Sequence, residues 1–436
     1  MLRLAIFLIA AAIGTYYALQ APFYALLCYL GNAYFRPEDW VWGDFVRSLH
    51  LSFVIGLYVI VSTVVLRHRF VWNGRIVLLW SFLLLAFLSS LLSEHSTYSW
   101  PYMIEFVKVV VMTYLIVTLT DDFAKFRLVS LTIVLGLGLE QGKQGWFYLL
   151  ASPGGANNNP VAFLGDNNGT AVGMLMLVPL AGLVMQTTQN KWVKRFFGGL
   201  LIGCIYRALS TYSRGGFLAA IAMGGVWILR THHKIRNLLG VLVVLVIVLL
   251  ALPDTFWNRM GTIRTYEEEE DKSAIGRLHF WSVAGAMATR NPILGIGFNS
   301  YNNAYDAYDV SAGKYGNERS VHSSFFGVLA ELGYVGLFLY VLILLSAFRA
   351  CAYVRRVASR NGALVDLGKG AVAIQTSLVA FVVGGSFVCF QYNEILWHVI
   401  GLSMVLRRLA AQQEQVLATQ LMIKEPPSPL RDPFAA

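Results

Sequence analysis

The sequence predicts an all-α integral membrane protein of about 12 transmembrane helices, with one large loop that contains an amphipathic helix. Of its 436 residues, 57% are hydrophobic and 13% are charged, roughly half the charged fraction of an ordinary soluble domain. Several continuous apolar runs reach the ~20 residues that cross a hydrocarbon core as a helix. A membrane β-barrel would instead show short segments of alternating hydrophobicity.

The spans follow one another from the N-terminus. Residues 1–35 form either one long crossing or two short helices broken around Gln20 to Pro22. This start lacks the cleavage site of a secretory signal and is expected to be retained. Hydropathy and loop charge then place further spans at 45–66, 75–93, 102–120, 127–150, 169–188, 196–212, 214–230, 236–252, 323–348, 368–389 and 391–406.

Loop charge predicts the orientation. With this set of spans, the short basic loops all fall on one side of the membrane; they contain Arg67, Arg69, Arg75, Lys125, Arg127, Lys191, Lys194, Arg195, Arg230, Lys234, Arg236, Arg349, Arg355, Arg356, Arg360, Arg407 and Arg408. By the positive-inside rule these loops face the cytoplasm, so the loops at 94–101, 151–168 and 253–322 face outward. The net charge of +10 is thereby explained without a nucleic-acid partner.

The chain divides into N-terminal transmembrane helices (1–252), an outer loop (253–322), C-terminal transmembrane helices (323–408) and a cytoplasmic tail (409–436). The outer loop holds seven basic and nine acidic residues, which is not a cytoplasmic pattern. Within it, Ser273 to Arg290 carries Ile275, Leu278, Trp281, Val283 and Met287 at the spacing of an amphipathic helix at the interface. The proline-rich tail is expected to be disordered.

No soluble-enzyme motif is present. The chain contains no nucleotide-binding loop, nucleophile elbow or HExxH sequence, and its four cysteines lack metal-site or disulfide spacing. Polar groups near the outer membrane edge are therefore the candidates, because burying them is costly.

Arg214 is the first candidate, in Ser210-Thr-Tyr-Ser-Arg-Gly-Gly between two spans. An arginine there either extends to the interface or binds a phosphate through its planar fork of donors. The small residues around it would let a ligand approach the backbone.

His322 is the second candidate, where the outer loop re-enters the membrane. A histidine suits proton transfer near neutral pH, although a local hydrogen bond at a helix N-terminus explains it equally well. Seven other histidines, His50, His68, His95, His232, His233, His279 and His398, are weaker candidates.

Further charged residues offer parts of an anion site. Arg277 begins the amphipathic helix and either binds an anion or pairs with the acidic run Glu267 to Asp271, which itself is expected to be a solvated surface. Arg264, Arg290 and Arg319 are other cations of the loop. Asp166, with Asn167 beside it, is either a ligand contact or a helix cap, with contact slightly favoured.

At these residues the sequence resembles the O-antigen ligase and polymerase family. The resemblance is sharpest at Leu164-Gly-Asp-Asn-Asn, Tyr212-Ser-Arg-Gly-Gly, Gly276-Arg-Leu-His-Phe-Trp with Asn291-Pro-Ile-Leu-Gly-Ile-Gly, and Val321-His-Ser-Ser-Phe with Glu331-Leu-Gly-Tyr-Val-Gly. It implies a GT-C-type membrane glycosyltransferase in the bacterial inner membrane with an active site facing the periplasm.

The resemblance also implies the reaction. An O-antigen ligase transfers a polysaccharide from undecaprenyl pyrophosphate to a lipid A core sugar, with no metal or other cofactor and with inversion at the anomeric carbon. It implies that His322 is the essential histidine and Arg214 the arginine of the Arg-Gly pair, and that Arg277 or Arg264 is a further essential arginine. Asp166, Asn167, Arg290 and Arg319 complete the expected site.

Other functions remain open on the sequence. An O-antigen polymerase and a protein O-oligosaccharyltransferase use the same donor with different acceptors. A glycolipid transporter is disfavoured because the chain shows no matching halves and its candidate charges lie at the membrane edge.

Overall fold

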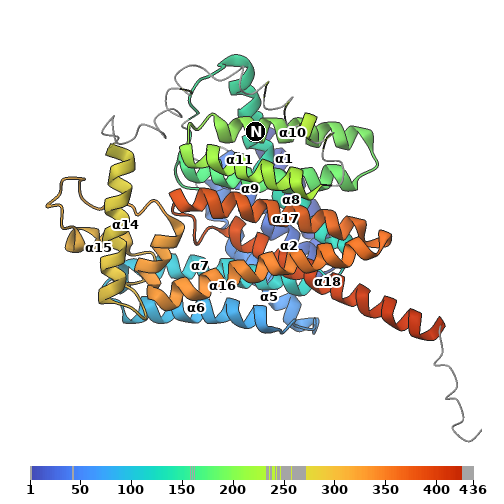
Figure 1. Cartoon of the computed structure of the whole chain (residues 1–436). Helices are drawn as coiled ribbons and strands as arrows, with labels where there is room; N and C mark the ends of the chain where they lie inside the picture. Colours follow the sequence, from blue (N-terminus) through green and yellow to red (C-terminus); the bar gives the residue numbers. More distant parts are fainter. Residues whose placement is uncertain are drawn as a thin grey trace, which may run out of the picture.

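A computed structural model describes residues 2–424 apart from 42–43, 158, 160, 162 and most of 232–271. In this part of the chain the structure is helical and contains no β-strand (Figure 1). Its helices are α1 (Leu2–Ala18), α2 (Pro22–Phe35), α3 (Pro37–Trp40), α4 (Phe45–Ser48), α5 (Leu51–Val65), α6 (Gly74–Leu92), α7 (Ser96–Leu119), α8 (Phe123–Ala151), α9 (Asn167–Thr187), α10 (Lys191–Leu209), α11 (Arg214–Arg230), α14 (Lys272–Arg290), α15 (Tyr301–Tyr308), α16 (Ser324–Arg360), η1 (Gly362–Leu364), α17 (Val365–Gly384), η2 (Gly385–Phe387) and α18 (Glu394–Lys424).

Six helical segments of the described chain are long and apolar enough to cross a membrane: Phe45–Val65, Gly74–Leu92, Ser96–Leu119, Asn167–Thr187, Ser324–Arg360 and Gly362–Phe387. The protein is therefore a multi-pass membrane protein. The helix α1 is apolar but has only 17 residues. The predicted span at 236–252 falls almost wholly outside the described residues.

The first 35 residues form two helices, which decides between the two predicted arrangements. Pro22 stands at the first position of α2, where its fixed φ suits a helix start and its missing N–H costs nothing. The chain between the two helices turns through Leu19 and Gln20.

Two helices extend beyond their predicted ends. The helix α16 continues to Arg360, so Arg349, Arg355, Arg356 and Arg360 lie on its last turns instead of in a short loop. The helix α18 continues to Lys424, so the prediction of a disordered tail from residue 409 is wrong for residues 409–424. Leu409 and Ala410 are buried, and Tyr353 of α16 donates a hydrogen bond to Glu414; these contacts stabilise the extension.

The core of the bundle surrounds α9, which packs against α8, α10, α11 and α17. In its apolar window 83% of residues are buried, the highest fraction among the six candidate spans. Nearby, Phe82, Phe106, Tyr340 and Trp397 form a cluster of aromatic rings between α6, α7, α16 and α18. Aromatic rings in such tilted and edge-to-face arrangements stabilise the packing of the four helices.

The helix connections gather at two ends of the bundle. At one end, Arg408 donates to the carbonyl of Thr120, and Lys369 lies 3.4 Å from the carbonyl of Gln186. At the other end, Ser99 Oγ lies 2.7 Å from Ser300 Oγ, and Asn393 donates to the carbonyl of Phe163 at 2.5 Å. The predicted outward loops thus meet at one end, which also carries α14 and α15 (Figure 1, left) and is called the α14 end below.

The helix α14 confirms the predicted helix at Ser273 to Arg290, but its buried face differs in part. Phe280, Val283, Ala284 and Met287 are buried in a small core with residues of α15. Leu278 was expected on the apolar face and is 56% exposed. Figure 1 shows α14 lying across the end of the bundle, crosswise to α16, against which it packs.

The turn at 291–297 connects the α14 end of the bundle to α16. The helix breaks at Gly333, where φ is 68°. The amide of Ile296 donates to the carbonyl of Ala330 at 3.0 Å, and the amide of Tyr334 donates to the carbonyl of Pro292 at 2.9 Å. The break exposes backbone groups of α16 that the turn at 291–297 then satisfies.

Candidate active site

His322 lies at the α14 end, two residues before α16. Its backbone adopts the left-handed conformation, with φ of 48°, which is uncommon for a residue with a side chain beyond Cβ. The indole N–H of Trp281 donates to the carbonyl of Val321 at 3.1 Å, and the Phe280 ring lies 6.2 Å from the imidazole. Two neighbouring residues of α14 therefore fix the chain around His322.

Three charged residues from separate parts of the chain act on the half-buried His322. Burial lowers its pKa below the ordinary value of 6.5, and the charges of Arg277 and Arg319 lower it further, while Asp166 opposes them. The imidazole is consequently neutral at pH 7 and able to accept a proton. Of the predicted site residues, the structure thus brings Asp166, Arg277 and Arg319 around His322.

Asp166 caps α9. Its Oδ1 accepts a hydrogen bond from the amide of Gly169 at 2.9 Å, and its Oδ2 accepts one from the side chain of Asn168 at 3.0 Å. The cap, which the sequence had left as the slightly less favoured alternative, is therefore present. Asp166 is exposed at the same time, and Asn167 beside it begins the helix.

Arg214 is the first residue of α11, and Ser213 caps this helix by accepting from the amide of Gly216. The expectation that small residues here admit a ligand is not met at Gly215 and Gly216. A Cβ on Gly215 would lie 2.9 Å from Phe387 Cβ, and one on Gly216 would lie 2.7 Å from Ala171 Cβ. Both glycines serve the close packing of α11 against α9 and η2.

Arg214 and His322 lie at the same end of the bundle. The end of η2 and the residue after it connect their surroundings, because Phe387 packs against Gly215 and Ser324 Oγ donates to the carbonyl of Val388 at 2.8 Å. A second connection runs from Ser213, which donates to Asn168 at 2.7 Å, to the cap of α9 at Asp166, whose charge acts on His322. The surroundings of the arginine and of the histidine are thus linked through these two connections.

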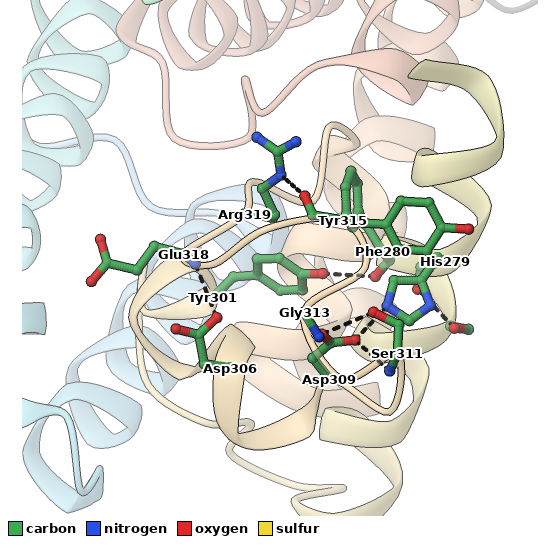
Figure 2. A network of polar contacts seen from close by, with 11 residues as sticks. His279, Phe280, Tyr301, Asp306, Asp309, Ser311, Gly313, Tyr315, Glu318 and Arg319 are labelled. Atoms are coloured by element: carbon green, nitrogen blue, oxygen red, sulfur yellow. Dashed lines mark hydrogen bonds and ion pairs between the residues drawn. The ribbon is translucent and has the colours of Figure 1, made fainter. Parts of the chain in front are cut away.

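The other predicted cations differ in their position relative to His322. Arg319 donates from Nε to the carbonyl of Tyr315, and its guanidinium is exposed (Figure 2). Arg290 lies 13 residues beyond Arg277 on α14, about 20 Å along the helix, and its guanidinium stacks 5.0 Å from the Tyr308 ring. The structure does not bring Arg290 to His322. Arg264 lies outside the described residues, as does the run Glu267 to Asp271.

Sequence reasoning missed two buried ionisable residues. Arg207 is fully buried in α10, where it donates to Gln141 at 3.0 Å and to the carbonyls of Asn157 and Asn159, which anchors the loop that leads to Asp166. Glu331 of α16 is 3% exposed and accepts from Tyr392 at 2.9 Å and from the amide of Tyr301 at 3.3 Å. Both lie inside predicted spans, so the cost of a charge at membrane depth was the available signal.

Together these groups offer a neutral base flanked by cations on a polar membrane edge. Such a set can take a proton from a hydroxyl and stabilise a phosphate leaving group. In the described residues no group of three or more His, Cys, Asp or Glu side chains is placed to hold a metal ion.

A comparison with known families identifies the central part of this arrangement. Residues 198–341 match the family model described as O-Antigen ligase. This segment contains Arg214, Arg277, Arg319 and His322, so the chain is similar to the O-antigen ligase family over the part that carries most of the candidate site. No curated protein matches the chain.

Proposed function

From this similarity to the O-antigen ligase family, we propose that the protein transfers a polysaccharide from undecaprenyl pyrophosphate to a lipid A core sugar at the periplasmic face of the bacterial inner membrane. The observation that carries the proposal is the neutral His322 beside Arg277 and Arg319. A base that is free of its proton at neutral pH, next to cations, fits the two demands of glycosyl transfer from a pyrophosphate.

In the proposed reaction His322 accepts the proton of the acceptor hydroxyl as that oxygen attacks the anomeric carbon. The bond between this carbon and the pyrophosphate oxygen breaks, and undecaprenyl pyrophosphate leaves with the bonding electrons. Arg214 and Arg277 bind the pyrophosphate and stabilise the charge that grows on it. The single displacement inverts the anomeric carbon, and the arginines supply the positive charge, so the proposed reaction is metal-independent.

Orientation follows from the same proposal. About 12 crossings, in the manner of the GT-C-type membrane glycosyltransferases, place the α14 end on the periplasmic side and the basic loops in the cytoplasm. A donor with a long hydrocarbon chain then enters from the membrane while its pyrophosphate lies at the membrane edge. Asp166, Asn167 and Arg319 are proposed to contact the sugar and phosphate groups of the bound donor.

A panel of acceptors tests the reaction. Purified protein in detergent receives one lipid-linked donor and, in separate reactions, lipid A core, a second lipid-linked glycan, or a protein with acceptor serines. We expect transfer to lipid A core. Transfer only to the second glycan would make the protein a polymerase, transfer only to protein would make it an O-oligosaccharyltransferase, and no transfer to any acceptor would favour a transporter.

A further inference from the structure

A buried hydrogen bond links α14 to the loop that precedes His322. The Nε2 atom of His279 lies 2.7 Å from Oδ1 of Asp309, and their side chains are only 13% and 5% exposed (Figure 2). The sequence ranked His279 among the weaker histidines and did not single out Asp309. The two residues are 30 positions apart, so no local pattern connects them.

Asp309 also organises its own loop. Its carboxylate accepts hydrogen bonds from the amide of Ser311 at 2.8 Å, from the hydroxyl of Ser311 at 2.9 Å and from the amide of Gly313 at 3.0 Å. Burial alone would raise its pKa, but these bonds and the one to His279 lower the pKa of Asp309 to about 2. The residue is therefore a charged anchor for the turn that begins at 309.

His279 also connects Asp309 to Arg319 through Tyr315. Its imidazole stacks on the Tyr315 ring, with centroids 4.7 Å apart and planes at 25°. The backbone carbonyl of Tyr315 accepts the hydrogen bond of Arg319 Nε. Figure 2 shows the sequence of contacts from Asp309 through His279 and Tyr315 to Arg319.

The same turn of α14 contacts the segment around His322. Phe280 packs near the His322 ring, and Trp281 donates to the carbonyl just before it. Three consecutive residues of α14 therefore hold three points of the loop: Asp309, His322 and Val321. A helix fixed at three points cannot rotate or slide without moving the cations beside the histidine.

We propose that His279 and Asp309 are a positioning pair that holds Arg277 and Arg319 in place around His322 and so sets the affinity for the pyrophosphate donor. This inference rests on the proposed function. Neither residue touches the reacting atoms; each acts through the loop and through α14. The pair therefore governs donor binding more than the rate of the chemical step.

The test measures transfer kinetics with separate titrations of lipid-linked donor and lipid A core. We expect His279→Ala and Asp309→Ala each to raise KM for the donor about five- to tenfold, the loss expected for a misplaced charge-assisted hydrogen bond. The acceptor KM and kcat should change less than about twofold. His279→Gln keeps an N–H donor for Asp309 and should recover most of the donor affinity.

A double-mutant cycle provides the second readout. The combined His279→Ala and Asp309→Ala variant should lose less donor affinity than the sum of the two single losses, because both single variants break the same His279–Asp309 hydrogen bond. Thr289→Ala is the matched control, since Thr289 is exposed on the same helix and bonds only to the Gly285 carbonyl; its effect should be small and additive.

Three outcomes contradict the inference. They are an unchanged donor KM in both single variants, a rise in acceptor KM as large as the rise in donor KM, or a double variant whose loss of donor affinity equals the sum of the two single losses. A loss of folding in the alanine variants would appear in their melting temperatures, and His279→Gln then decides the matter. Absence of transfer by the unaltered protein would instead contradict the proposed function itself.

Discussion

His322 combines a strained backbone with a side chain whose pKa is lowered by its surroundings. Its φ of 48° is a conformation that costs about 1–3 kcal/mol for most residues and persists only when the surroundings enforce it. Burial, Arg277 and Arg319 lower its pKa, and Asp166 raises it. The residue that the proposal makes the base is therefore the one whose geometry and charge the neighbouring elements jointly determine.

These charges predict opposite shifts in the pH profile of transfer. A base with a lowered pKa is active once pH exceeds that pKa, so the acidic limb of kcat/KM should have its midpoint below 6.5. Arg319→Gln removes a cation, raises the pKa of His322 and should move the midpoint to higher pH. Asp166→Asn removes an anion and should move it to lower pH.

Lys314→Gln is the matched control for this pair of variants. Lys314 is exposed in the same loop and lies over the Tyr315 ring, so its loss should leave the midpoint in place. Shifts of the same sign for Arg319→Gln and Asp166→Asn would mean that His322 is not the titrating base.

Among the elements, the loop from Asp309 to Arg319 is anchored at its start by the ionised carboxylate of Asp309. Because the folded-state pKa of Asp309 is about 2 and its ordinary value is 3.8, its contribution to stability is complete above about pH 4. The contribution is lost as pH falls through 2. We expect hydrogen exchange of amides 309–319 to stay slow between pH 7 and 4, after correction for intrinsic exchange, and to increase below it. Loosening of this loop already at pH 5–6 would contradict the role assigned to Asp309.

The turn at 291–297 fastens the α14 end to the break in α16. Gly295 has φ of 67°, and a Cβ there would collide with the backbone of Glu331. Gly295→Ala should therefore destabilise the protein by about 1–3 kcal/mol, seen as a lower melting temperature in detergent. Gly285→Ala on α14, where a Cβ meets nothing within 4 Å, should be neutral or slightly stabilising. Equal effects of the two changes would show that the turn does not bear on stability.

The sequence predicted the elements better than their contacts. Hydropathy located the apolar helices because each is a long continuous apolar stretch, and helical spacing located α14. The ends of α16 and α18 were wrong, because these helices continue outside the apolar zone through contacts such as that of Tyr353 with Glu414. The pairing of His279 with Asp309 could not be predicted, since it depends on how the loop folds back onto α14.

For the molecule as a whole, the gathering of loops at two ends predicts which residues each side of the membrane can reach. Val310 is 88% exposed in the loop after α15 at the α14 end, whereas Gln413 is exposed near the far end of α18. With the native cysteines replaced, a membrane-impermeant maleimide added from the periplasm should label a Val310→Cys variant. It should label a Gln413→Cys variant only after the membrane is dissolved. The reverse pattern would invert the proposed orientation.

The central claim is that Arg214 and His322 serve one reaction at the α14 end. Its most direct measurement is the rate of glycan transfer from a lipid-linked donor to lipid A core by purified Arg214→Ala and His322→Ala variants that elute and melt like the unaltered protein. Loss of a general base costs about 10²–10⁴-fold, so each variant should transfer at least about 10²-fold more slowly. Transfer by either variant at a rate near that of the unaltered protein would contradict the account.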